Sequence, residues 1–195
     1  MDIRDAGPLD HPGIDAVVRG AFADHGLVAA LVADLRASGA IEVELVAVDD
    51  GVVVGHVALE RGWVDAEESL AEVLVLSPLS VAPARQGSGL GSRLVEAALE
   101  AGRQRRERYV FLEGSPDFYS ERGFEPAEPR GFLRPSDRIP GPAFQVAVLD
   151  DRGVTGRLVY PDAFWRHDAV GLRGEVLAQV RDQLGDRGVR RRSGP

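Results

Sequence analysis

Residues 79–94 read LSVAPARQGSGLGSRL, and this stretch decides the fold. An apolar run ends in it, glycines stand at positions 87, 89 and 91, and an amphipathic pattern follows. The order predicts a buried strand, a tight turn and a helix over about residues 89–106. The first turn of a helix has about four backbone N–H groups without intrahelical partners, and aligned peptide dipoles add about half a positive charge there. Because glycines leave this backbone open, the stretch predicts a cradle for a phosphate group, flanked by Arg85 and Arg93.

Taken alone, the glycine triplet has two other interpretations. It can make a turn that holds no ligand. It can also belong to a dinucleotide-binding unit, although the spacing is G-x-G-x-G and not G-x-G-x-x-G. That second interpretation needs an acidic residue at a strand end about twenty residues further on. Glu113 lies near that distance, so spacing alone leaves the interpretation open.

Composition narrows the chemistry. The chain has 195 residues, which suits one domain with a modest extension. It has no Cys, which excludes disulfides, thiolate nucleophiles and Cys-ligated metal sites. All 23 basic residues are Arg, so a Schiff-base lysine and a P-loop lysine are also excluded. The net charge of −8 argues against a nucleic-acid partner and favours neutral or cationic ones.

Apolar periodicity and turn residues predict the remaining elements. Asp49-Asp50-Gly51 predicts a hairpin turn, Ser77-Pro78 predicts a bulge or a local break in the strand ladder, and Asp10 is the expected N-cap of the first helix. The expected strands cover residues 2–6, 43–48, 52–59, 72–81, 109–112, 144–149 and 154–160, and the further helices cover residues 9–22, 27–37, 116–122 and 175–184.

Neither a membrane-spanning segment nor a signal peptide is evident in the sequence. The longest apolar stretch, residues 52–59, is far shorter than the roughly 18 residues of a membrane span. The N-terminus is charged and lacks the apolar core of a signal peptide. We therefore expect a cytoplasmic protein without a membrane partner. Residues 186–195 carry four Arg and one Asp, which predicts a solvated basic tail.

A second motif strengthens the first. Residues 118–124 read FYSERGF, a Tyr followed by Gly-Phe just after the next expected strand. Together with the QGSGLG of residues 86–91, this resembles the GNAT superfamily of acyl-CoA-dependent N-acetyltransferases. The stretches 140–144 and 160–164 look like those of its small bacterial YhbS-like branch. The segment 113–116 lacks the Asn that many members carry there.

The resemblance covers roughly residues 2–165 and implies a fold. That fold is α/β (α+β), with a central mixed, mostly antiparallel sheet that has splayed central strands and is flanked by helices. Residues 1–165 would form the acetyltransferase domain. Residues 166–195 would form a C-terminal helical extension and the basic tail.

The resemblance also implies a place for acetyl-CoA as co-substrate, between the strands at 72–81 and 109–112. Backbone groups at the end of the first strand would bind the thioester carbonyl and the pantetheine arm, and the amides of the glycine turn would hold the pyrophosphate. The cofactor-binding residues expected in this way are Leu79, Ser80, Val81, Gln86, Gly87, Ser88, Gly89, Leu90, Gly91 and Ser92.

Acetyl transfer to an amine needs a proton donor for the departing thiolate and an acceptor for the proton of the amine. Tyr119 of the second motif is the expected donor, although it can also be simply a packed aromatic residue. Removing a proton from an alkyl amine of pKa about 10.4 costs about 4.6 kcal/mol near pH 7, so a base is required. Glu113 is the candidate at the end of the second strand, and Glu72 and His56 are the alternatives. His56 can equally be a partnered strand histidine, and the spacing of the other histidines predicts no metal site.

These inferences converge on an enzyme. We expect acetyl transfer to a primary amine of a small molecule or peptide, by direct attack in a ternary complex without a covalent intermediate. A non-catalytic acyl-CoA sensor or interaction module is the alternative. The expected protein is a monomer or a homodimer.

Overall fold

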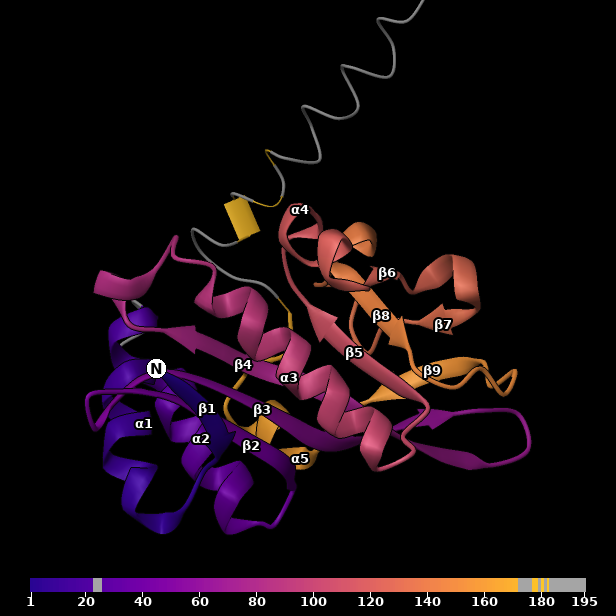
Figure 1. Ribbon diagram of the computed structural model, residues 1–195. Coiled ribbons are helices and arrows are strands. Elements are labelled where there is room, and N and C mark those ends of the chain that lie inside the picture. Colours follow the sequence, from indigo (N-terminus) through magenta and orange to yellow (C-terminus); the bar gives the residue numbers. More distant parts are fainter. Residues whose placement is uncertain (23–25, 172–176, 179, 181, 183–195) are drawn as a thin grey trace, which may run out of the picture.

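The sheet organises the molecule. The computed structural model describes residues 1–22, 26–171, 177–178, 180 and 182. In this part of the chain seven strands follow one another across the sheet in the order β1-β2-β3-β4-β5-β8-β6, and β9 joins the far part of β3 and pairs with β7 (Figure 1). Most neighbours are antiparallel, while β4–β5 and β7–β9 are parallel. The strands are β1 (Asp2–Asp5), β2 (Ile41–Asp49), β3 (Val52–Asp65), β4 (Leu70–Val81), β5 (Tyr109–Glu113), β6 (Glu125–Pro126), β7 (Phe132–Leu133), β8 (Phe144–Val148) and β9 (Gly156–Val159).

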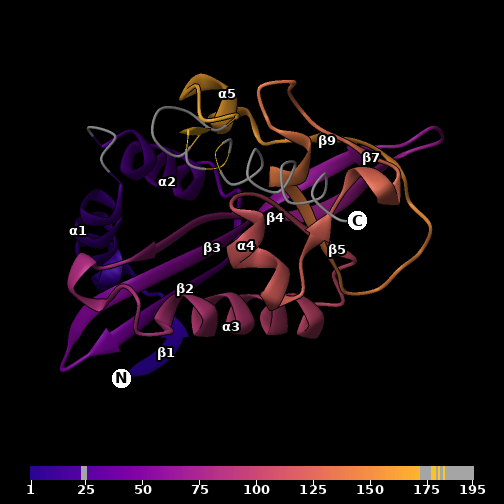
Figure 2. The same cartoon turned by 90° about the horizontal axis from the view of Figure 1, so that it is seen from above.

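Helices cover both faces of the sheet. Figure 2 shows α1 (His11–Ala21), α2 (Leu27–Ala37) and α5 (Asp162–Arg166) on one side, and α3 (Leu90–Gln104) with the one-turn α4 (Pro116–Tyr119) on the other. The apolar stripe of α3 is buried against the sheet through Leu90, Leu94, Val95, Ala98 and Leu99. The mixed, mostly antiparallel sheet flanked by helices confirms the predicted fold class.

The hairpin and the bulge form where the sequence predicts them. Asp50 and Gly51 both have positive φ, 48° and 79°, which turns β2 back into β3. Val57 is opposite Leu79 and Leu59 is opposite Leu76, so Ser77 and Pro78 together face one residue of β3. The Ser77-Pro78 peptide is cis. The bulge redirects the last residues of β4 away from β5.

The two central strands separate after a short contact. β4 and β5 are paired only at Leu74–Val110 and Val75–Phe111. β4 then continues beside β3 as far as Val81, and β5 continues beside β8 as far as Glu113. Each strand therefore keeps one neighbour and loses the other, which confirms the expected splayed geometry.

Some boundaries differ from the prediction. The Asp10 side chain does not cap α1. It accepts the Gly7 N–H at 2.8 Å and pairs with Arg4 at 2.7 Å instead. The strand β3 extends six residues beyond the predicted end at 59, because residues 60–65 pair with the beginning of β4 and, at the end, with β9. The helix α5 was not predicted, since five residues are too few for a helical apolar pattern.

The C-terminal part of the chain is described only in places. The predicted helix over 175–184 and the basic tail lie largely outside the described residues. Val170 and Val180 belong to the same buried cluster as Phe111 and Phe144. The division at residue 165 remains a prediction. Within the ranges that the structure describes, none of the helices has the length and apolar character needed to cross a bilayer.

Candidate functional site

A cavity of about 440 Å³ lies where β4 and β5 separate. One part of its wall comes from the bulge of β4 and from the segment between β5 and α4. The other part comes from the end of α1, the first turns of α2, and the α5 region. The main contributors are Ser77, Pro78, Leu79, Glu113, Gly114, Ser115, Tyr119, Phe22, Leu27, Val28, Leu31, Tyr160 and Phe164. The cavity therefore joins the two faces of the sheet through the gap between its central strands.

A second hollow, of about 640 Å³, lies between the beginning of β2 and the last turns of α3. Several of its charged side chains already have partners: Arg36 pairs with Glu44 at 2.5 Å, and Arg105 donates to the backbone oxygen of Glu42 at 2.5 Å. It lacks contact with either sequence motif. The cavity in the sheet is the candidate site despite its smaller volume.

The end of β4 presents backbone donors to the gap. The Ala82 N–H bonds the Val54 oxygen of β3 at 2.9 Å. Successive amides of a strand point to opposite edges, so Ser80 also faces β3, whereas Leu79 and Val81 face the edge that β5 has left. Three residues at this end of β4 were expected to bind the co-substrate. Two of them, Leu79 and Val81, direct their backbone N–H groups into the gap. The Ser80 side chain is buried.

The glycine turn is open to a ligand. Gly87 and Gly89 have φ of 73° and 82°, the left-handed region that favours glycine, and a Cβ at either position would meet nothing within 4 Å. The first helical bond of α3 runs from the Arg93 N–H to the Gly89 oxygen, so the preceding amides of the helix have no intrahelical partner. At Gly91 a Cβ would lie 3.4 Å from the Phe118 ring, which marks the closed side of the turn. An open row of amides at the start of a fifteen-residue helix fits a diphosphate.

Polar side chains of the turn bind the turn itself. Gln86 donates from Nε2 to the Val81 oxygen at 3.2 Å, and Ser88 donates from Oγ to the Arg85 oxygen at 2.6 Å. Arg85 forms an ion pair with Asp49 of β2. The side chains therefore fix the loop, and the backbone amides are left for a ligand. Arg93 is exposed on the first turn of α3.

Arg122 connects the two sequence motifs, a role that was not predicted from the sequence. Its Nε donates to the Ser92 hydroxyl at 2.8 Å, and its guanidinium lies 3.8 Å above the centroid of the Phe118 ring. A second bond reaches the Phe118 carbonyl oxygen. The contact spans thirty residues, and the only signal in the sequence is the place of Arg122 within the second motif.

Tyr119 lies at the cavity wall with its ring over a glycine. A Cβ at Gly114 would lie 2.4 Å from Cε2 of Tyr119, so the ring packs directly on the glycine backbone. Gly114 is fixed by its N–H bond to the Ala143 oxygen at 3.0 Å and by Gln145 Nε2, which donates to its carbonyl at 3.2 Å. Burial raises the pKa of Tyr119 to about 12, although the nearby positive charge of Arg122 acts to lower this pKa. The phenol is therefore protonated throughout the neutral range.

Glu113 lies at the end of β5 on the wall of the same cavity. Its Oε2 accepts the Gly171 N–H at 3.0 Å, and its Oε1 is buried without a hydrogen-bond partner among the described residues. Burial raises the pKa of Glu113 to about 7, although the Tyr160 hydroxyl, the Gly171 N–H and the charge of Arg138 all favour the ionised form. A carboxyl group that titrates near neutrality can both bind and release a proton under working conditions.

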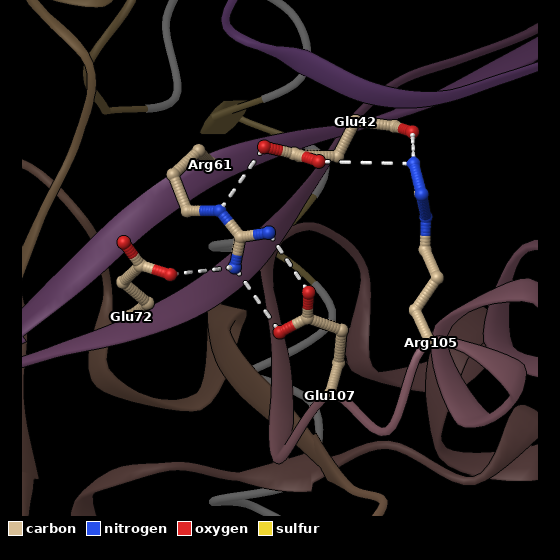
Figure 3. A network of polar contacts seen from close by, with 5 residues as sticks. All are labelled: Glu42, Arg61, Glu72, Arg105 and Glu107. Carbon is tan, nitrogen blue, oxygen red and sulfur yellow. Dashed lines mark hydrogen bonds and ion pairs between the residues drawn. The ribbon is translucent and has the colours of Figure 1, made fainter.

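The two alternative bases lie elsewhere. Glu72 is 69% exposed and belongs to a network in which Arg61 contacts it at 3.8 Å and Glu107 at 2.8 Å (Figure 3). Five residues of strand separate Glu72 from the bulge at Ser77, a distance of about 17 Å. The side chain of His56 is fully buried in β3 and contacts Glu44 at 3.1 Å, so it is the partnered strand histidine. Neither residue lines the cavity.

Comparisons with known proteins agree with this fold. Residues 18–124 match the model of the Acetyltransferase (GNAT) family. The chain is 38% identical over 172 residues to the uncharacterized N-acetyltransferase YhbS of Escherichia coli K12, and the alignment covers 85% of this chain and 99% of that one.

Two solved structures are similar over most of the chain. The crystal structure of Escherichia coli YhbS in complex with CoA has a TM-score of 0.78 at 36% identity, covering 85% of this chain and 92% of that one. A GNAT family acetyltransferase from Brucella melitensis, crystallised with acetyl-CoA, has a TM-score of 0.70 at 29% identity, covering 84% and 97%. With more than half of its length matched by the family model and a relative of this similarity over nearly its whole length, the chain belongs to the GNAT family of acetyltransferases.

Proposed function

We propose that the protein transfers an acetyl group from acetyl-CoA to a primary amine by direct attack in a ternary complex. The observation that carries the proposal is the alignment of three features. An open glycine turn at a helix N-terminus leads to the unpaired edge of β4, and that edge leads to a cavity containing a carboxyl group with a pKa of about 7. The similar proteins crystallised with CoA and acetyl-CoA support the choice of co-substrate.

In this proposal the backbone holds the co-substrate. The amides from Gln86 to Ser92 bind the diphosphate, and those of Leu79 and Val81 bind the pantetheine arm and the thioester carbonyl oxygen. A backbone N–H aimed at that oxygen stabilises the negative charge that develops during attack. The helix N-terminus adds its dipole at the diphosphate. Arg122 fixes Ser92 and Phe118 beside this row of amides.

In this proposal two side chains transfer protons, one as acceptor and one as donor. An alkylammonium group first loses one proton, which Glu113 takes at its carboxylate, directly or through one water. The amine nitrogen then forms a bond to the thioester carbon, the carbon–sulfur bond breaks, and the nitrogen loses a second proton to solvent as the amide forms. Tyr119 gives its hydroxyl proton to the departing sulfur, which leaves as a thiol, and the phenolate regains a proton from solvent. Because the chain has no Cys, no acetylated cysteine intermediate is formed.

Glu113→Gln should remove the acid limb of the pH profile. In the unaltered protein kcat should rise with pH through about 7, because the base is active only when ionised. The variant should lose about 100-fold in kcat at pH 7.5, with no break near pH 7. Steady-state kinetics between pH 5.5 and 9 measure both effects. Glu72→Gln, a carboxylate outside the cavity, is the matched control. A break near pH 7 that persists in Glu113→Gln would contradict the assignment.

Gly114→Ala should lower kcat about tenfold or more by moving Tyr119. The added methyl group would overlap the ring at 2.4 Å, and misplacement of a reacting group by about 1 Å can cost 100-fold. Gly7→Ala is the control, since its Cβ would meet its nearest neighbour at an ordinary 3.8 Å. Kinetics at saturating acetyl-CoA report the loss. Equal kcat in the Gly114 variant and the unaltered protein would show that the ring position is not important.

Ligand-dependent melting combined with turnover tests the function as a whole. CoA and acetyl-CoA should raise Tm, and NAD should not. Thiol release from acetyl-CoA in the presence of primary amines should then be observed. A Tm shift without release for any amine would identify an acyl-CoA sensor. A shift with NAD alone would identify the dinucleotide-binding alternative.

A further inference from the structure

The cavity has two chemically different halves. Towards α4 it is lined by the segment 113–115 and by Tyr119. Towards α2 and α5 its wall is mostly apolar, formed by Leu27, Leu31 and Phe164 together with the Tyr160 ring. The Tyr160 and Phe164 ring centroids lie 4.8 Å apart, so the two rings form one continuous aromatic surface. A molecule that enters from this side meets carbon on most of its surface.

Few charged side chains line the cavity. Over the described ranges, only two ionisable side chains other than tyrosine line it, Glu113 at the end of β5 and Asp168 just after α5. Asp168 is exposed and is paired with Arg138 at 3.5 Å. Glu113 is the enclosed carboxyl group, and its Oε1 has no hydrogen-bond partner among these residues. Among the described residues, Glu113 is therefore the enclosed carboxyl group available to a cation, beside the gap through which the acetyl group would arrive.

We propose that the acceptor is a primary monoamine with an apolar body, an alkylamine or arylalkylamine. This inference rests on the proposed acetyl transfer. The ammonium group is placed at Glu113, where its proton is taken, and the apolar body lies against Leu31 and the Tyr160–Phe164 surface. A second ammonium group on the same molecule would lie against leucine and phenylalanine without a partner, and burial of an unpaired charge is strongly unfavourable. Polyamines and aminoglycosides are therefore poor acceptors.

Two amines that differ only at one end of the molecule test this proposal. Hexylamine and 1,6-diaminohexane have the same chain, but the second carries an ammonium group in place of the terminal methyl group. At saturating acetyl-CoA, thiol release should give hexylamine a kcat/KM at least about 30-fold higher, because only its tail matches the apolar wall.

Leu27→Glu should reverse the preference. Leu27 lines the cavity and is 38% exposed at the first position of α2, where a carboxylate is compatible with the helix dipole. The variant should gain about tenfold or more for 1,6-diaminohexane and lose activity for hexylamine. Leu70→Glu is the matched control, since Leu70 is 58% exposed on β4 and lies outside the cavity. Its ratio of the two kcat/KM values should equal that of the unaltered protein.

The outcomes separate this inference from the function on which it rests. Equal or better use of 1,6-diaminohexane by the unaltered protein would overturn the apolar-monoamine class and leave acetyl transfer intact. Turnover of spermidine or of a lysine peptide without turnover of hexylamine would do the same. Absence of both thiol release and a CoA-dependent Tm shift would instead overturn the proposed function. A preference for hexylamine that Leu27→Glu reverses and Leu70→Glu preserves would support the proposal.

Discussion

Tyr119→Phe should lower kcat about 300-fold while the Kd for CoA stays within about twofold. The substitution removes one hydroxyl that donates to the departing sulfur, and loss of one such donor typically costs 100- to 1000-fold, or about 2.7–4 kcal/mol. The ring itself is retained, so its packing on Gly114 and its edge contacts with Phe118 and Phe124 remain. Because the pKa of Tyr119 is about 12, the defect should be constant from pH 6 to pH 10.

Tyr109→Phe is the matched control for this prediction. Tyr109 is also buried and donates its hydroxyl to Asp151 at 3.0 Å, but it lies outside the cavity. Its loss should cost about 1 kcal/mol of stability and leave kcat unchanged. Calorimetric titration with CoA and kinetics at saturating amine provide the two measurements. Unchanged kcat in Tyr119→Phe would remove this residue from the mechanism.

Gly89→Glu should weaken CoA binding more than about 1000-fold. The open space above Gly89 is where the diphosphate would lie, and a carboxylate there would compete for the same amides and repel the phosphates. Like charges placed together at an interface cost several kcal/mol, and about 4.1 kcal/mol corresponds to 1000-fold in Kd. The measurement is calorimetric titration with CoA.

Backbone strain is a second consequence of Gly89→Glu, and the control must share it. Gly153 has φ of 70°, and a Cβ there would also meet nothing within 4 Å. Gly153→Glu therefore introduces the same residue into the same backbone conformation, away from the glycine turn. We expect it to lose some stability and to keep its affinity for CoA. Comparable loss of affinity in both variants would assign the effect to the fold rather than to the cradle.

Local patterns in the sequence predicted much of the fold. The leucines at 27, 31 and 35 placed α2 at its observed bounds, and Asp49-Asp50-Gly51 placed the first hairpin. The same holds for the bulge at Ser77-Pro78, because proline cannot donate to the ladder. These features depend on the conformational preferences of a few neighbouring residues, which the sequence displays directly.

Long-range features were harder to predict. Tyr160 forms part of the cavity wall although it follows β9, and Arg122 bonds Ser92, which lies thirty residues earlier in the sequence. Neither contact has a periodic signal, since both depend on how distant elements pack. Glu72 is different, because the rise of about 3.3 Å per residue in a strand already places it far from the bulge. The strand itself therefore contained the information that removes Glu72 from the candidate bases.

The separation of β4 and β5 leaves two unsatisfied edges inside one sheet. Within a sheet such an edge is normally closed by a neighbouring strand, and an open one readily accepts another chain. In the proposed complex the pantetheine arm occupies the position of the missing strand and accepts bonds from the amides of Leu79 and Val81. Substrate binding would then complete the architecture. Hydrogen exchange at these two amides should slow markedly with CoA, while the amide of Ser80, already directed to β3, should change little.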